Sequence, residues 1–292
     1  MFCFHFPQVS VRGILLNLIF VIHEGNMAED LRANVSTASI TSQPVGEIVS
    51  GWTPRANPAA DSKYKVLQGQ YCRLELLTSE TSPSTIQQLY DAFKPTEQTH
   101  FTYLYYGPFE TVDQFTQFLH TLLESSANTV VYLVIVNEVA IGFITYLRIN
   151  EKDGTIEIGH VNFSQQLART REATEASFLL IQYAFDVLGY RRVEWTCNPL
   201  NEKSYRAALR LGFQYEGRWL KHSICKDRSA DMAWFSIVDD EWSLVKQEIQ
   251  RWLKADNFDI DGQQLSKLNS AQANLRLIKT STSINEKNNV VS

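Results

Sequence analysis

The chain has 292 residues, of which 44% are hydrophobic and 20% charged, a composition typical of a folded globular protein rather than a disordered one. Its 32 Asp and Glu outnumber its 27 Lys and Arg, and the formal net charge of -5 argues against a nucleic-acid-binding surface, which needs clustered basic residues. The four cysteines lie far apart without zinc-ligand spacing, so we expect free thiols in a reducing compartment and no metal site.

The first 62 residues hold one apolar run, from Gly13 to Ile22. The run is too short to span a bilayer, contains the polar Asn17, and lacks the cationic start and cleavage site of a signal peptide. We therefore expect no membrane association and a cytoplasmic location. The Ser-, Thr-, Ala- and Pro-rich sequence that follows predicts a largely disordered N-terminal extension over residues 1–62. Because Met27 would make a natural start, residues 1–26 are hypothesised to be an upstream extension.

Hydrophobic periods predict a strand, two helices and a three-stranded meander in the first half of the domain. Alternating apolar and polar residues mark the first strand, and apolar residues at three- and four-residue spacing mark the second helix. Short turns between the next three strands indicate antiparallel neighbours. The predicted ranges are a strand at 71–77, helices at 82–93 and 111–125, and strands at 129–136, 140–149 and 155–163.

After Gln165 the spacing of apolar residues changes from every second residue to a period of about 3.6, which predicts a helix that Gly189 terminates. The elements after it are predicted as a strand at 192–197, a helix at 202–211, strands at 219–225 and 232–238, and an amphipathic helix from Asp239 or Asp240, one of which is its N-cap, to Trp252. We expect little order in the polar tail, residues 256–292, beyond a short helix around 263–277. The sequence thus predicts a mixed α/β domain over residues 68–255 with a single sheet flanked by helices.

Five stretches within residues 71–242 carry a resemblance to a known family. They are Ile156–Phe163 (IEIGHVNF), Arg169–Ala176 (RTREATEA), Asn198–Ser204 (NPLNEKS) with Arg210–Phe213 (RLGF), Phe185–Trp195 and Asp231–Ser236. Each alone is an ordinary core strand, helical first turn or cap, but their joint order resembles the GNAT superfamily of N-acetyltransferases, most closely the RimJ/RimL-like, ribosomal-protein acetyltransferase branch. The resemblance implies the GNAT fold, acetyl-CoA as co-substrate, and an amine acceptor.

The resemblance also implies where acetyl-CoA binds. A helix amino end suits the pyrophosphate, because its unpaired amides and its dipole favour an anion. The family's loop reads R/Q-x-x-G-x-G/A. When this sequence is aligned to that loop with Ala173 as the last position, Ala168 stands in place of the basic or amide residue and Arg171 in place of glycine. Glycine permits close backbone approach to phosphate, so we expect Arg169 and Arg171 to compensate with charge-assisted hydrogen bonds; a solvated arginine pair is the alternative. The residues carried over are Val161, Phe163, Arg169, Thr170, Arg171, Glu172, Ala173, Thr174, Asn201 and Ser204.

Three residues are candidates for proton transfer. Glu157 is the best carboxylate for accepting the amine proton, directly or through water, although a strand glutamate paired with Arg or Lys fits it equally well. Ser204 matches the general-acid position of the ribosomal branch, whereas Tyr205 matches the tyrosine of many other GNAT enzymes, and the sequence does not rank them. Asn201 also suits an N-cap. His160 and His222 are more typical of structural histidines.

We expect direct transfer of acetyl from CoA to a primary amine in a ternary complex, because Cys197 has no evident base partner and no other cysteine lies near the motifs. One alternative is a CoA-binding sensor or scaffold that has lost turnover. Another is an interaction domain that uses the aromatic loop between Phe93 and Phe109. The acceptor, whether a protein N-terminus or a small amine, stays open, as does the choice between monomer and homodimer.

Overall fold

The computed structural model describes residues 46, 48–58, 60, 62–124 and 128–273, so most of the predicted N-terminal extension and the last part of the tail lie outside the described residues. The chain divides into two units, Met1–Gly51 and Trp52–Ser292, and all the helices and strands named below belong to the second. No helix of the described part is both long and apolar enough to cross a membrane.

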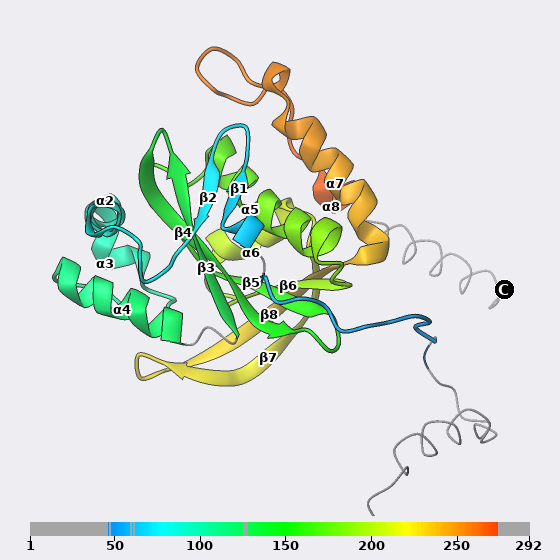
Figure 1. The fold of residues 1–292 in the computed structure, drawn as a ribbon, viewed down its shortest axis with the longest axis horizontal. Coiled ribbons are helices and arrows are strands. Elements are labelled where there is room, and N and C mark those ends of the chain that lie inside the picture. The colour runs from blue at the N-terminus through cyan, green and yellow to red at the C-terminus, as the bar shows by residue number, and fades with distance from the viewer. Residues whose placement is uncertain (1–45, 47, 59, 61, 125–127, 274–292) are drawn as a thin grey trace, which may run out of the picture. The chain divides into compact units, whose positions relative to one another are not determined.

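A single sheet of eight strands forms the centre of the domain, in the order β1-β2-β3-β4-β5-β6-β8-β7 (Figure 1). All neighbouring strands are antiparallel except β5 and β6, which are parallel. The strands are β1 (Val66–Gln68), β2 (Arg73–Leu76), β3 (Thr129–Val136), β4 (Val139–Asn150), β5 (Thr155–Phe163), β6 (Arg192–Cys197), β7 (Gln214–Cys225) and β8 (Arg228–Val238). The predicted GNAT fold is confirmed.

Helices cover both faces of the sheet (Figure 1). On one face α2 packs on β4 and α4 on β3, while α5, α6 and α7 contact the other face. The helices are α2 (Pro83–Phe93), α3 (Glu97–His100), α4 (Val112–Glu124), α5 (Arg171–Gln182), α6 (Glu202–Arg210), α7 (Asp239–Leu253) and α8 (Ser270–Ala273). A π-helical turn, Tyr183–Val187, extends α5, and short 3-10 turns lie at Ser62–Tyr64, Lys94–Thr96 and Ala255–Asn257.

The two faces of the sheet bury two separate apolar clusters. In β3, alternate residues point to opposite faces, so Val130 and Val134 join the larger cluster under α5–α7, whereas Val131 and Leu133 join the smaller one under α2 and α4. This explains why β3 reads as an unbroken apolar run, since both of its faces are buried.

The structure departs from the sequence-based element boundaries in four places. Two short elements, β1 and α3, were not predicted, because three or four residues carry no measurable period. β7 begins at Gln214, well before the predicted start, since two register shifts interrupt its alternation. The prediction that Asp239 or Asp240 caps α7 is wrong: Val238 is the N-cap, and its amide donates to Glu241 Oε2 at 3.1 Å.

The tail carries more order than expected over its first part, whereas the helix expected around 263–277 is present among the described residues only as α8, and residues 263–269 are not helical. Phe258 and Gln264 form an isolated bridge, and Leu268 and Ser270 are buried against the domain. Hydrogen bonds from the Asn257 side-chain amide to the carbonyls of Trp252 and Ser266 hold this segment to the end of α7. Apolar anchors spaced irregularly in a polar segment give no period, which is why the sequence did not reveal the packing.

Candidate functional site

Pairing between the parallel strands β5 and β6 stops halfway along β5. The register runs from Thr155 opposite Arg192 to Ile158 opposite Trp195, after which β5 continues to Phe163. Within the described chain, no strand pairs with the edge of β5 that faces away from β4 over residues 159–163. We call this stretch the open edge of β5. Its outward backbone amides and carbonyls are therefore available to hydrogen-bond an extended ligand.

A β-bulge lies at the start of the open edge. Phe143 pairs with Asn162 and Thr145 with Gly159, so Ile144 alone faces two residues of β5. One of them, His160, has a left-handed φ of 42°, which is rare for a residue other than glycine. Bulges re-aim backbone and side chains and are frequent beside active sites.

Glu157 precedes the bulge on β5 and is almost completely buried, with 2% of its surface exposed. Thr196 Oγ1 donates a hydrogen bond of 2.6 Å to Glu157 Oε1, and Arg148 Nη2 forms an ion pair with Oε2. Burial raises the pKa of Glu157 to about 7, against the opposing pull of Arg148 and Thr196. A carboxylate with a pKa near neutral can both take up and release a proton at physiological pH.

The amino end of α6 follows β6 and carries three of the predicted residues. Asn201 is the N-cap, and its Oδ1 accepts a 3.3 Å hydrogen bond from the Ser204 amide. Ser204 Oγ accepts a 3.0 Å bond from the indole of Trp195. Because that oxygen accepts from the indole, its own hydrogen can be donated to another acceptor, and the Cys197 thiol lies within hydrogen-bonding reach of it.

The ring of Tyr205 packs against residues of β7 and β8. Its ring packs edge-on against Phe235 at 4.8 Å between centroids and lies 6.0 Å from the ring of Tyr215. Burial raises its pKa above the usual value, which disfavours the phenolate. The structure therefore aligns Ser204 with β6 and directs Tyr205 toward β7 and β8.

Glu157 and Ser204 belong to opposite faces of the sheet. Trp195 lies opposite Ile158 in the register, so Trp195 and its partner Ser204 are on the face that Ile158 occupies, and Glu157 is on the other. A reacting group at the open edge of β5 is reachable from both faces, because no neighbouring strand closes that edge.

The amino end of α5 follows β5 in the chain, after residues 164–170. Thr170 is the N-cap and its Oγ1 accepts a 3.2 Å bond from the Ala173 amide. The amides of Arg171 and Glu172 precede the first i to i-4 bond of the helix, so they point outward along its axis. Arg169, directly before the cap, is exposed and has a φ of 68°.

Arg171 is turned toward the β1–β2 turn. Its guanidinium lies 4.3 Å from the ring centre of Tyr71 and 5.5 Å from that of Phe258, and its Nε pairs with Glu172 Oε1 at 3.1 Å. These cation–π contacts hold the side chain against the surface of the domain. Thr174, one turn into the helix, accepts a 2.9 Å bond from Arg210 at the end of α6.

A strap crosses the face of the sheet on which Glu157 lies. It consists of the loop after α3, residues 101–106, and the end of the β7–β8 hairpin. Lys226 Nζ donates to the Phe101 carbonyl at 2.8 Å, and Tyr105 and Ser223 share a hydroxyl hydrogen bond of 2.6 Å. The predicted aromatic loop thus contacts a hairpin more than a hundred residues away.

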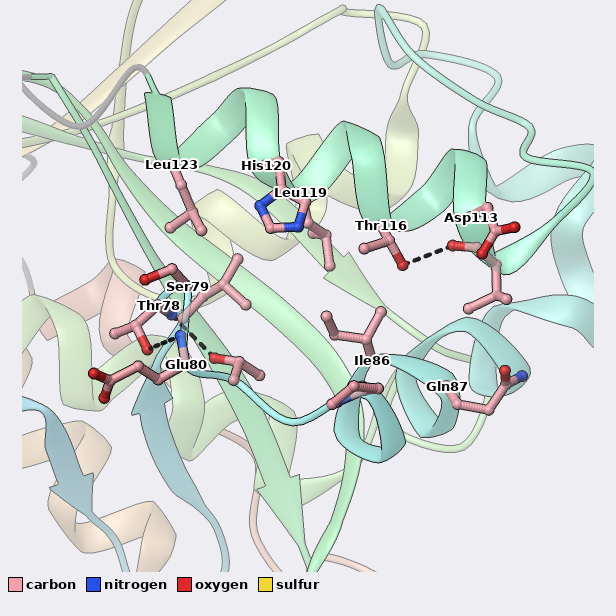
Figure 2. Close-up of a pocket in the computed structure, with 14 residues that line it drawn as sticks. Thr78, Ser79, Glu80, Ile86, Gln87, Asp113, Thr116, Leu119, His120 and Leu123 are labelled. Carbon is pink, nitrogen blue, oxygen red and sulfur yellow. Dashed lines mark hydrogen bonds between the residues drawn. The ribbon is translucent and has the colours of Figure 1, made fainter.

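A separate hollow of about 470 Å³ lies between α2 and α4. Figure 2 shows Ile86 of α2 facing Leu119 of α4, with Thr78, Ser79 and Glu80 at one end. Its lining includes no residue of the open edge of β5 or of the amino ends of α5 and α6. The hollow is therefore distinct from the site described above.

Comparison with known proteins connects this geometry to a family. A family model described as the acetyltransferase (GNAT) domain matches residues 76–214. A crystal structure of a GCN5-related N-acetyltransferase from Brucella melitensis is 39% identical to this chain, with a TM-score of 0.69, and the match covers 75% of this chain and 96% of that one. The chain belongs to the GNAT acetyltransferase family.

Two further proteins similar to this GNAT protein are also described as acetyltransferases. A probable GNAT-family acetyltransferase from Chromobacterium violaceum is 37% identical, with a TM-score of 0.62, over 69% of this chain and 98% of its own. The uncharacterized N-acetyltransferase YnaD of Bacillus subtilis is 30% identical over 89 residues, which are 30% of this chain, and the chain spans only about half, 52%, of that protein. Membership of the family implies acetyl-CoA-dependent acetyl transfer.

In this GNAT protein the structure brings together most, but not all, of the residues singled out from the sequence. Val161 and Phe163 lie on the open edge of β5 and Glu157 earlier on the same strand, while the other candidates lie at the amino ends of α5 and α6. The ring of Tyr205 packs on Phe235 while its hydroxyl interacts electrostatically with Cys197 at the end of β6, and the guanidinium of Arg171 lies over Tyr71.

The alternative that Glu157 pairs with an Arg or Lys is confirmed by its ion pair with Arg148, although the sequence reasoning identified neither Arg148 nor Thr196 as a partner. Arg148 has a φ of 45° at a register irregularity of β4, and its guanidinium lies 4.7 Å from the ring centre of Trp234. Thr196 is the second residue before the turn at the end of β6. Alternation along β6 could have placed Thr196 on the face of Glu157, but the irregularity of β4 left no sequence signal for Arg148.

Proposed function

We propose that this protein transfers the acetyl group of acetyl-CoA directly to a primary amine in a ternary complex. The observation that supports the proposal most strongly is the buried Glu157 carboxylate, with its pKa near neutral, beside an open strand edge. In this role Glu157 accepts the proton that the amine loses as it attacks the acetyl carbonyl, directly or through a water.

Ser204 is proposed as the general acid for the departing thiolate. Its hydroxyl oxygen accepts from the Trp195 indole, and in this role its hydrogen turns from the neighbouring Cys197 thiol to the departing thiolate. Tyr205 is the alternative acid, but the packing of its ring against Phe235 and Tyr215 favours a structural role.

The proposed acetyl-CoA site combines the open edge with two helix ends. Backbone groups at Val161 and Phe163 would bind the extended arm, and the first-turn amides of α5 would bind the pyrophosphate. Thr170 shapes that turn through its cap, and Asn201 does the same for α6. The proposed contact residues are Val161, Phe163, Arg169, Thr170, Arg171, Glu172, Ala173, Thr174, Asn201 and Ser204.

Direct transfer is favoured over an acyl-cysteine intermediate. Cys197 is the cysteine nearest the proposed acid, and burial raises its pKa to about 11, so it stays a thiol at neutral pH. The nucleophile in thioester exchange is the thiolate. Mass spectrometry of the protein after incubation with acetyl-CoA alone tests this, and an acetylated Cys197 would overturn it.

The acceptor is proposed to be either a protein N-terminus or a small amine, with the RimJ/RimL-like branch as the closest type on the motifs of β5 and α5. We propose residues 68–255 as the catalytic domain. Because the strap crosses the face of the sheet on which Glu157 lies, an acceptor whose amine stands at the end of a narrow, extended chain fits this proposal best.

A second candidate is a CoA-binding sensor or scaffold without turnover. The observation that favours it is the engagement of Arg171 with Tyr71 and Glu172, at the position where the family has glycine. This reading predicts binding of acetyl-CoA without release of free CoA.

A thiol-release assay across a panel of amines separates these readings. The panel should contain N-terminal peptides of ribosomal proteins, free amino acids, polyamines and aminoglycosides, with Glu157→Gln as the matched inactive variant. Turnover that Glu157→Gln abolishes supports the enzyme. Calorimetric binding of acetyl-CoA with no turnover on any amine supports the sensor.

A further inference from the structure

A chain of hydrogen bonds holds the bulge of β5 at its strained residue. His160 is left-handed at a φ of 42°, a conformation that persists only where surrounding contacts impose it. The His160 carbonyl accepts a 3.0 Å bond from Asn162 Nδ2, and its Nδ1 lies 3.0 Å from the hydroxyl of Tyr106. Both the backbone carbonyl and the imidazole ring of His160 are therefore held by hydrogen bonds.

Asn162 is the centre of this chain and is fully buried. Its Nδ2 also donates to the Tyr106 hydroxyl at 2.8 Å, and its Oδ1 lies 3.0 Å from His100 Nε2. With the amide in this orientation, His100 donates to Asn162, Asn162 to Tyr106, and Tyr106 to His160. Each group donates to the next, so the bonds polarise one another in the same sense.

The four side chains are neutral at physiological pH. Burial lowers the pKa of His160 to about 4, and it lowers that of His100 as well. Burial also holds the pKa of Tyr106 well above its usual value. A network of neutral donors and acceptors fixes geometry without changing charge near pH 7, which argues against His160 as an acid or base there.

The outer end of the chain is anchored in the aromatic wall of the smaller cluster. The ring of Tyr106 stacks on Phe118 of α4 at 4.1 Å, and that of His100 lies 4.7 Å from Phe93 and 4.8 Å from Phe101. These contacts leave the network little freedom to move. They connect the bulge rigidly to α3 and α4.

We infer that Asn162 and Tyr106 are positioning residues for acetyl transfer, holding the His160 bulge so that the backbone of the open edge is correctly placed for the thioester carbonyl. The inference rests on the proposed function. Neither side chain needs to touch the reacting atoms: a misplacement of about 1 Å in a catalytic group can cost about 100-fold in rate.

The test uses Tyr106→Phe, because it removes only the hydroxyl that joins Asn162 to His160, whereas replacing the fully buried Asn162 risks unfolding. Tyr90→Phe is the matched control. Its hydroxyl also bonds the loop before α4, to the carbonyls of Phe109 and Glu110 at 3.3 and 2.8 Å, but does not reach β5. We measure kcat and KM for acetyl-CoA, and hydrogen exchange of the peptide covering residues 157–163.

The expected result is a fall in kcat of about 10- to 100-fold in Tyr106→Phe with little change in KM, and faster exchange over residues 159–163. Tyr90→Phe should show neither effect. Equal kcat in the two variants, unchanged exchange in Tyr106→Phe, or a loss confined to KM would each overturn the inference.

Failure of the proposed function shows up separately, in the wild-type protein. If no amine gives turnover, the inference is decided by hydrogen exchange of the peptide covering residues 157–163, measured once with acetyl-CoA bound and once with CoA bound. Protection that is specific to acetyl-CoA in the wild type and lost in Tyr106→Phe supports positioning of the acetyl group. Identical protection by the two ligands in the wild type overturns it.

Discussion

Arg148 and Glu157 form an ion pair in which only the carboxylate is buried. The Arg148 side chain is 46% exposed and lies over the ring of Trp234, whereas that of Glu157 is 3% exposed. An exposed cation can move aside at little desolvation cost, but the carboxylate cannot follow it into water. The pair thus holds the Glu157 carboxylate inside the protein beside a cation that reaches the surface.

The first prediction concerns the pH dependence of turnover. If Glu157 is the base, kcat/KM should rise with pH through a midpoint near 7 and then level off, since only the carboxylate accepts the amine proton. The measurement needs an acceptor amine that is unprotonated throughout the range. Glu157→Gln should lower kcat/KM by about 100- to 10,000-fold and abolish the rise; a variant that keeps both the rate and the profile would exclude Glu157 as the base.

A second prediction tests the partner of that base. Arg148→Gln removes the cation that favours the carboxylate, so the midpoint of the pH profile should move to higher pH. Arg218→Gln is the control, because Arg218 pairs with Asp231 on the β7–β8 hairpin. A midpoint that stays in place in Arg148→Gln, or moves equally in both variants, contradicts the assignment.

Stability should also depend on Glu157. Its folded pKa of about 7 lies above the ordinary glutamate value of 4.5, so the folded protein binds this proton more tightly than the unfolded chain does. The stabilisation that this bound proton gives to the folded state is complete below pH 4.5 and is lost as pH rises through 7. The free energy of unfolding changes by on the order of 3 kcal/mol. Urea unfolding of the wild type and Glu157→Gln at pH 5 and pH 8 checks this, and the variant should lose less stability than the wild type between the two pH values.

The two candidate acids can be ranked by kinetics. Ser204→Ala should reduce kcat by about 100-fold or more, because it removes the oriented hydroxyl. Tyr205→Phe keeps the ring contacts with Phe235 and should change kcat far less. The reverse order would transfer the role to Tyr205.

The last prediction concerns the support of α5. Both carboxylate oxygens of Glu175, which is 4% exposed, accept bonds from the backbone amides of Gln70, Tyr71 and Cys72, at 2.7 to 2.8 Å. Glu175→Gln loses an acceptor and should cost about 2 to 3 kcal/mol in urea unfolding. Glu202→Gln, which removes an exposed pair with Arg206, should cost well under 1 kcal/mol; equal losses would refute the proposed support.

Most of the fold was predictable from periods and turn residues, because long strands and amphipathic helices leave strong patterns. The meander and the helix that Gly189 ends are examples. The site was less predictable: two of its features depend on non-glycine residues with positive φ, Arg148 and His160, and nothing in the residue types marks those conformations. Asn162 likewise looked like any strand residue, since its role arises from His100 and Tyr106, more than fifty positions earlier.

The strap has a consequence for how the protein is made. Its two hydrogen bonds join residues 118 and 125 positions apart, so the strap closes only after the β7–β8 hairpin has left the ribosome. Contacts of such high sequence separation form late, because loop-closure entropy opposes them until the intervening chain has folded. A nascent chain that holds Glu157 and Ser204 but not yet this hairpin still lacks the strap, and any acceptor selectivity that depends on the strap arises only after the hairpin has been made.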